Sequence, residues 1–67
     1  MLNITINGES RQFASALTVA GLIDQLGSSG KRIAIERNGE IVPKSRHAST
    51  PIVSGDRLEI VVAVGGG

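Results

Sequence analysis

Two Asn-Gly dipeptides, at residues 7–8 and 38–39, constrain the fold of this chain more than any other feature. Asn-Gly is the residue pair best suited to the positive φ angles of a two-residue hairpin turn. Before the first pair, LNITIN alternates apolar and polar residues, which is typical of a strand with one buried face. The following SRQFA is expected to return antiparallel, with Phe13 pointing into the core. The second pair lies inside RIAIERNGEIVP and predicts another hairpin that ends at Pro43.

The segment between the two hairpins has a different hydrophobic period. Its apolar residues have the i, i+3, i+4, i+7 spacing of one helical face: Val19, Leu22, Ile23 and Leu26. Thr18 is the expected N-cap, and Leu17 and Leu22 have the spacing of a hydrophobic staple. Gly27 suits the left-handed position just after the helix. Gly21 within the helix costs about 1 kcal/mol relative to alanine, so packing must stabilise the helix.

The last strand is expected within RLEIVVAV, residues 57–64. Alternation puts one set of residues on the inner face: Leu58, Ile60, Val62 and Val64. The opposite face, with Glu59, Val61 and Ala63, is too apolar for a surface that meets only solvent. Val61 and Ala63 are therefore predicted to form a patch on which a partner protein docks, extended by Val42 or Ala34. The alternative is a scatter of surface aliphatic residues.

The order of elements predicts the fold class. A hairpin, a helix, a second hairpin, an irregular connection and a strand indicate an α+β domain in which one helix covers one face of a small sheet. The connection KSRHASTPIVSGD, residues 44–56, has no sustained period and is expected to hold at most one short turn of helix. We expect the domain to span residues 1–64 and a glycine tail to follow at 65–67.

Composition excludes several classes of function. The 67 residues include no cysteine, which rules out disulfides, thiolate metal sites and cysteine nucleophiles. Seven Lys or Arg and six Asp or Glu give a formal charge of +1, too balanced for a nucleic-acid or anionic-membrane surface. The sequence has no signal-peptide pattern and no stretch approaching the ~20 apolar residues of a membrane span, so we expect a cytoplasmic protein.

The side chains offer few candidates for chemistry. GSSGK at residues 27–31 is too short for a phosphate-binding loop, and it follows a helix where that motif follows a strand. His47 lies in a polar loop without an orienting partner nearby in sequence, so we interpret it as a solvated histidine. The carboxylates are scattered and are expected to serve mainly solubility: Glu9, Asp24, Glu36, Glu40, Asp56 and Glu59. Lys44, Arg46 and His47 form a basic cluster that fits a solvated loop better than a contact with an acidic partner.

Three consecutive glycines, residues 65–67, follow the predicted last strand. A glycine arm has no Cβ atoms, so it can pass through a channel too narrow for side chains, and three residues span up to about 10 Å. The functional group at its end is the α-carboxylate of Gly67. A carboxylate becomes reactive when a partner enzyme activates it, most simply as an acyl-adenylate made from ATP. A frayed end or a cloning scar is the alternative.

The whole chain resembles the ThiS family, the sulfur carrier proteins of thiamine biosynthesis, which have a ubiquitin-like β-grasp fold. The residues that carry the resemblance are INGE at 6–9, TVAGLIDQL at 18–26, IAIERNGEIVPKSRHAST at 33–50, GDRLEIV at 55–61 and the terminal VGGG. Gly21 departs from the family, where we would expect Glu or another good helix former. The resemblance implies a mixed sheet, a flexible tail, no bound cofactor, and a protein that is a substrate of other enzymes instead of an enzyme.

The resemblance also implies a role for the tail. A ubiquitin-activating-like adenylyltransferase would use ATP to adenylate Gly67, and a cysteine-derived persulfide would convert the adenylate to a thiocarboxylate. Thiazole synthase would then take the sulfur into the thiazole ring of thiamine. Gly66 is the other member of the family's Gly-Gly end, and Gly65 precedes that pair, so both are expected to thread into the partner's active site.

Three other functions are compatible with the same residues. The molybdopterin-synthase small subunit is similar in fold and thiocarboxylate end but typically longer. A ubiquitin-like modifier, or a sulfur carrier of another pathway, would use the same tail. A β-grasp interaction module would use the glycines as a linker and would not depend on a free terminus.

Overall fold

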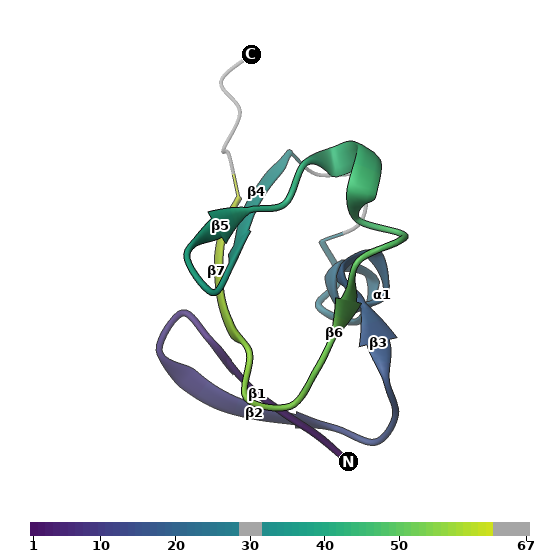
Figure 1. Cartoon of the computed structure of the whole chain (residues 1–67), viewed down its shortest axis with the longest axis vertical. Helices are drawn as coiled ribbons and strands as arrows, with labels where there is room; N and C mark the ends of the chain where they lie inside the picture. Colours follow the sequence, from purple (N-terminus) through teal and green to yellow (C-terminus); the bar gives the residue numbers. More distant parts are fainter. Residues whose placement is uncertain (29–31, 63–67) are drawn as a thin grey trace.

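The structure, a computed structural model, describes residues 1–28 and 32–62 (Figure 1). Its elements are β1 (Leu2–Ile6), β2 (Glu9–Phe13), β3 (Leu17–Thr18), α1 (Val19–Gln25), β4 (Ile33–Arg37), β5 (Glu40–Ile41), the 3-10 turn η1 (Lys44–Arg46), β6 (Pro51–Ile52) and β7 (Arg57–Val62). The two predicted hairpins, the helix and the last strand are present, which confirms the α+β class. In the described ranges no helix is of membrane-spanning length, since α1 has seven residues.

Five strands form one mixed sheet in the order β2-β1-β7-β4-β5. The central strand is β7, which runs parallel to β1 and antiparallel to β4. The two hairpin pairs, β1 with β2 and β4 with β5, are antiparallel. The two hairpins therefore meet only through β7, and the sheet is completed when this late strand inserts between them.

The Asn-Gly turns have the predicted backbone conformation, and their asparagines also hold the central strand. Positive φ angles occur at Asn7 (50°) and Gly8 (83°), and again at Asn38 (53°) and Gly39 (86°). The Asn7 side chain accepts a hydrogen bond from the Ile60 N–H at 2.8 Å and donates one to the Ile60 carbonyl at 3.1 Å. Asn7 therefore substitutes for a strand neighbour beyond the end of β1.

The helix begins and ends as the sequence predicts. Thr18 Oγ1 accepts a hydrogen bond from the Gly21 N–H at 3.1 Å, which confirms the N-cap. Gly27 has a φ of 72°, and its N–H donates to the Asp24 carbonyl. The Ser28 N–H donates to the Ile23 carbonyl, which completes a Schellman C-cap.

A small second sheet, β3 paired with β6, was absent from the sequence prediction. Leu17 lies opposite Ile52, and Thr18 lies opposite Pro51. Strands of two residues are too short to show a period, which is why 44–56 looked irregular. The one short turn of helix expected there is η1. Figure 1 shows the β3–β6 pair next to α1, across the core from the main sheet.

The core between α1 and the sheet is aliphatic. Its buried residues come from both layers: Leu2, Ile4, Ile6, Val19, Leu22, Ile23, Ile35, Ile52 and Leu58. Phe13 packs against this cluster but is only partly buried, so it lies at the core margin. Val42 also packs against the core, so the prediction that it could join an outer patch is wrong.

Asp56 corrects the prediction that the carboxylates serve mainly solubility. It is 4% exposed and accepts hydrogen bonds from Arg37 Nε at 2.7 Å, the Val53 N–H at 2.9 Å and Asn38 Nδ2 at 3.0 Å. Burial acts to raise the pKa of Asp56, but these hydrogen bonds outweigh it and hold the pKa below the ordinary value. Asp56 therefore joins the second hairpin to the turn before β7.

Candidate functional site

The last described residues of β7 have fewer strand neighbours than the residues at its start. β1 pairs with β7 only as far as Leu58, whereas β4 continues beside it as far as Val62. Val61 is 65% exposed and Val62 is 38% exposed. After Ile60, which bonds to the Asn7 side chain, the end of β7 pairs with β4 alone among the described residues. The predicted tail, Gly65, Gly66 and Gly67, lies outside the described residues.

The predicted outer patch is present in part. Val61 lies directly opposite Ala34 in the antiparallel register of β4 and β7, so Ala34, one of the two suggested extensions, joins it on this face. Ile41 of β5 lies opposite Glu36 on the same face and is 74% exposed, a position that the sequence analysis missed. We define Ala34, Ile41 and Val61 as the outer patch. Ala63, the other predicted member, lies outside the described residues.

Two glutamates face each other beside the outer patch. Glu36 of β4 lies directly opposite Glu59 of β7, and both are exposed. Like charges at directly opposite positions of a sheet destabilise the pairing. The described structure has one ion pair, Arg37–Asp56, and it does not involve either glutamate. This face of the sheet therefore carries two glutamates beside the outer patch, and Arg57 lines the same hollow as both of them.

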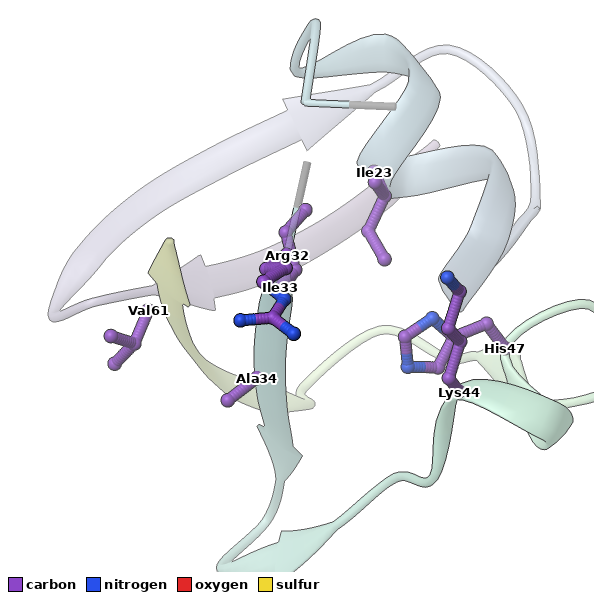
Figure 2. A pocket seen from close by; sticks show the side chains of 7 residues that line it. All are labelled: Ile23, Arg32, Ile33, Ala34, Lys44, His47 and Val61. Carbon is purple, nitrogen blue, oxygen red and sulfur yellow. The ribbon is translucent and has the colours of Figure 1, made fainter. Parts of the chain in front are cut away.

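A groove of about 440 Å³ lies around the start of β4 (Figure 2). Its apolar walls come from Ile23 of α1, from Ile33 of β4, and from Ala34 and Val61, which it shares with the outer patch. Arg32, Lys44 and His47 complete the lining. Figure 2 shows Arg32 over β4 with Lys44 and His47 across from it, on a different segment of the chain. We call this feature the basic groove.

His47 is not the freely solvated histidine that the sequence suggested. Its ring Nε2 lies 3.1 Å from the Val42 carbonyl, which can only accept, so Nε2 donates this hydrogen bond and carries the proton. The His47 carbonyl accepts from the Ala20 N–H in the first turn of α1 at 2.8 Å. These two contacts fix the segment after η1 against the helix and place the ring in the groove wall.

The predicted basic cluster is divided by η1. Lys44 and His47 line the basic groove, whereas Arg46 lines a separate hollow between β5 and Thr50. Arg32 takes the third basic position in the groove, and sequence reasoning missed it. Arg32 and Lys44 are 12 positions apart on separate segments, so only the folded chain brings them to one groove.

The described residues contain no candidate metal site. Residues 1–28 and 32–62 include no group of three His, Asp or Glu side chains that could hold a metal ion. In the same ranges, no buried polar side-chain atom lacks a hydrogen-bond partner. Of the GSSGK segment, the structure describes Gly27 and Ser28, which belong to the C-cap of α1. We take the outer patch and the basic groove as the candidate binding surfaces among the described residues.

Comparison with known proteins shows matches along nearly the whole chain. The ThiS family profile matches residues 4–67. A thiazole synthase of Paramagnetospirillum magneticum is 47% identical over 66 residues, which are 98% of this chain and 20% of that protein. The chain thus spans about a fifth of this curated relative. An uncharacterized protein of Porphyra purpurea, ycf40, is 38% identical, with 98% of this chain and 93% of that protein covered.

Solved structures agree with the sequence matches. The crystal structure of a thiamine biosynthesis protein, ThiS, from Geobacter metallireducens superposes with a TM-score of 0.83 at 28% identity. The match covers 98% of this chain and all of that chain. A solution structure of a thiamine biosynthesis protein from the same organism gives a TM-score of 0.80. The predicted β-grasp fold is confirmed, and the chain belongs to the ThiS family of sulfur carriers in thiamine biosynthesis.

Proposed function

We propose that this protein carries sulfur as a thiocarboxylate on Gly67 and donates it for thiazole formation in thiamine biosynthesis. The observation that carries the proposal is the family match, which runs through the glycine tail to residue 67. The absence of cysteine supports it, because the chain has no thiol on which sulfur could be carried. The protein acts as a co-substrate, and its partners supply the catalysts.

The proposed loading begins with activation of the Gly67 carboxylate. A carboxylate oxygen attacks the α-phosphorus of ATP on the partner adenylyltransferase, pyrophosphate leaves, and Gly67 becomes an acyl-adenylate. A cysteine persulfide then attacks the acyl carbon and AMP leaves, which gives an acyl disulfide. A second thiol breaks its sulfur–sulfur bond, and the products are the Gly67 thiocarboxylate and a disulfide on the donor side. Thiazole synthase then accepts the sulfur from the thiocarboxylate.

The glycines before the acceptor explain how this carboxylate could reach a closed active site. Gly65 and Gly66 have no side chains, so a channel around them can be as narrow as the backbone itself. The arm of three residues reaches up to about 10 Å from the end of the domain. We therefore assign Gly65 and Gly66 to threading and Gly67 to the chemistry.

The outer patch is the proposed docking surface for these partners, together with the predicted Ala63. Val61 supports this assignment because it is highly exposed and lies on the strand that leads to the tail. One relative contains this domain within a thiazole synthase chain, which supports association with that enzyme. Val61→Asp or Ala63→Asp should weaken binding of the thiazole synthase more than it lowers the melting temperature. Ala16→Asp is a matched control for Ala63→Asp, since Ala16 is exposed between β2 and β3, outside the patch.

Two variants of the terminus test the acceptor role. Deletion of Gly67, or addition of one residue after it, should leave the thermal melt unchanged and abolish sulfur loading by adenylyltransferase, ATP and a persulfide donor. One residue added before Met1 is the matched control and should load normally, because Met1 is 80% exposed at the other end of the chain. If the Gly67 variants still donate sulfur, the acceptor is elsewhere. If loading is normal but thiazole synthase does not use the product, the carrier serves another pathway.

A further inference from the structure

The basic groove combines aliphatic walls with cationic side chains. Among its described lining residues, Ile23, Ile33 and Val61 are aliphatic, and none is Asp or Glu. Arg32 and Lys44 are exposed, and neither takes part in the ion pair that the described residues contain. A surface that is apolar at its centre and positive at its rim attracts a ligand with the complementary pattern.

The structure favours a protein segment over a small anion as this ligand. Small-molecule sites usually hold a few precisely placed polar groups that fix the ligand. Here the cationic groups lie on separate exposed segments, before β4 and in η1, and they do not converge on a buried polar centre. Within the described ranges, every buried side-chain polar atom already has a partner. The groove is therefore suited to apolar contact with charges at its rim.

We infer that the basic groove binds a partner segment in which an aliphatic side chain is flanked by carboxylates. The aliphatic side chain packs against Ile23 and Ile33, and the carboxylates pair with Arg32 and Lys44. His47, whose Nε2 is held by Val42, forms part of the wall in a fixed orientation. The groove carries Arg32 and Lys44, whereas Glu36 and Glu59 lie opposite each other farther along β4 and β7. The inference goes beyond the proposed function, because it requires no chemistry at Gly67.

The test is a titration of the isotopically labelled full chain with a short capped peptide of alternating leucine and glutamate. We expect backbone amide shifts to change at Ile23, Ile33, Lys44 and His47. The double variant Arg32→Glu/Lys44→Glu should bind this peptide about five- to tenfold more weakly, because exposed ion pairs contribute modestly. Raising the salt concentration should also weaken binding of the peptide to the wild type, because salt screens exposed charges.

A charge-matched control separates the groove from net charge. Arg11→Glu/Arg57→Glu changes the charge by the same amount on two exposed arginines that do not line the groove. This variant should keep wild-type affinity for the peptide. Melting curves of both double variants verify that each remains folded. An equal loss of affinity in the two double variants would overturn the inference, since binding would then depend only on total charge.

Other outcomes would also overturn it. A leucine–glutamine peptide that binds as tightly as the leucine–glutamate peptide would show that the rim charges are not used. An absence of shifts at Ile23, Ile33, Lys44 and His47 would exclude the groove. Binding to phosphatidylserine vesicles without binding to the peptide would assign the surface to a lipid. Failure of peptide binding with normal sulfur loading leaves the proposed function intact, and failure of loading with normal peptide binding leaves this inference intact.

Discussion

The two ends of β7 differ in how firmly the fold holds them. At its start, Arg57 donates its N–H to Asn38 Oδ1 at 2.9 Å, and its carbonyl accepts from the Asn38 N–H at 2.7 Å. Leu58, the next residue, is 1% exposed and lies between β1 and β4. At its other end, Val61 and Val62 are accessible and pair with β4.

This difference separates stability from function along a single strand. The buried polar network around Asp56 and the aliphatic core fix where β7 begins. The exposed end contributes Val61 to both the outer patch and the basic groove. Substitutions at the start should therefore change the free energy of unfolding, whereas substitutions at the end should change interactions with partners.

The largest effect is expected from Asp56→Ala. This change leaves Arg37, Asn38 and the Val53 N–H without their shared acceptor, and such losses cost about 2–3 kcal/mol of unfolding free energy. Val61→Ala, at the opposite end of β7, should cost less than about 0.5 kcal/mol because its side chain is mostly exposed. Chemical denaturation of both variants measures the contrast. Similar losses for the two variants would contradict the difference between the two ends.

Protonation of Asp56 at low pH should reproduce part of the stability loss expected for Asp56→Ala. The pKa of Asp56 is lowered in the folded state relative to 3.8, so its carboxylate contributes stability that is complete above that value. This contribution is lost as the pH falls through the folded-state pKa. Denaturation at several pH values below 4 should therefore show a steeper loss for the wild type than for Asp56→Asn. Parallel pH profiles would mean that Asp56 has the same pKa in both states.

Substitution of Asn7 should lower the free energy of unfolding by a smaller amount. It tests only the hydrogen bonds between the Asn7 side chain and Ile60 of β7. Asn7→Gly keeps a residue that tolerates positive φ but removes both hydrogen bonds to Ile60, and it should cost about 1 kcal/mol. Asn7→Ala also introduces backbone strain at a φ of 50° and should cost more. Amide hydrogen exchange at Ile60 should accelerate in both variants. Unchanged exchange would show that the Asn7 side chain does not protect the strand.

The smallest effect is expected from Glu59→Lys, and it has the opposite sign. This change replaces two facing glutamates by a pair of opposite charges, in which the new lysine faces Glu36. It should raise the unfolding free energy by about a few tenths of a kcal/mol, measured by chemical denaturation. Glu9→Lys is the control. Glu9 lies opposite the uncharged Ile6, and this substitution changes the net charge by the same amount. A gain for Glu9→Lys equal to that for Glu59→Lys would assign the effect to total charge instead of the facing pair.

Local sequence signals predicted most of the fold. Asn7-Gly8 and Asn38-Gly39 fixed both hairpins, because positive φ at consecutive residues is a local requirement. Thr18 and Gly27 marked the helix ends through bonds to backbone groups within a few residues. The β3–β6 pair and the Asp56 network were missed because each joins residues far apart in sequence. No local pattern distinguishes the buried Asp56 from the exposed Glu40.

The site was predicted less completely for the same reason. Alternation in the last strand correctly exposed Val61, and Ala34 proved to be its cross-strand neighbour. Val42 was misplaced because the register of the second hairpin puts Ile41 opposite Glu36 on the outer face, so that the next residue, Val42, faces the core. The basic groove needs α1, β4 and η1 in place before its charges come together.

The most direct test of the proposed acceptor role of Gly67 is the intact mass of the protein after loading. The chain is incubated with its adenylyltransferase, ATP, a persulfide donor and a thiol, and its C-terminal fragment is then sequenced by mass spectrometry. We expect the replacement of one oxygen by one sulfur, located on Gly67 and dependent on ATP. An unchanged mass under conditions that load another ThiS protein, or sulfur located on any other residue, would contradict the account.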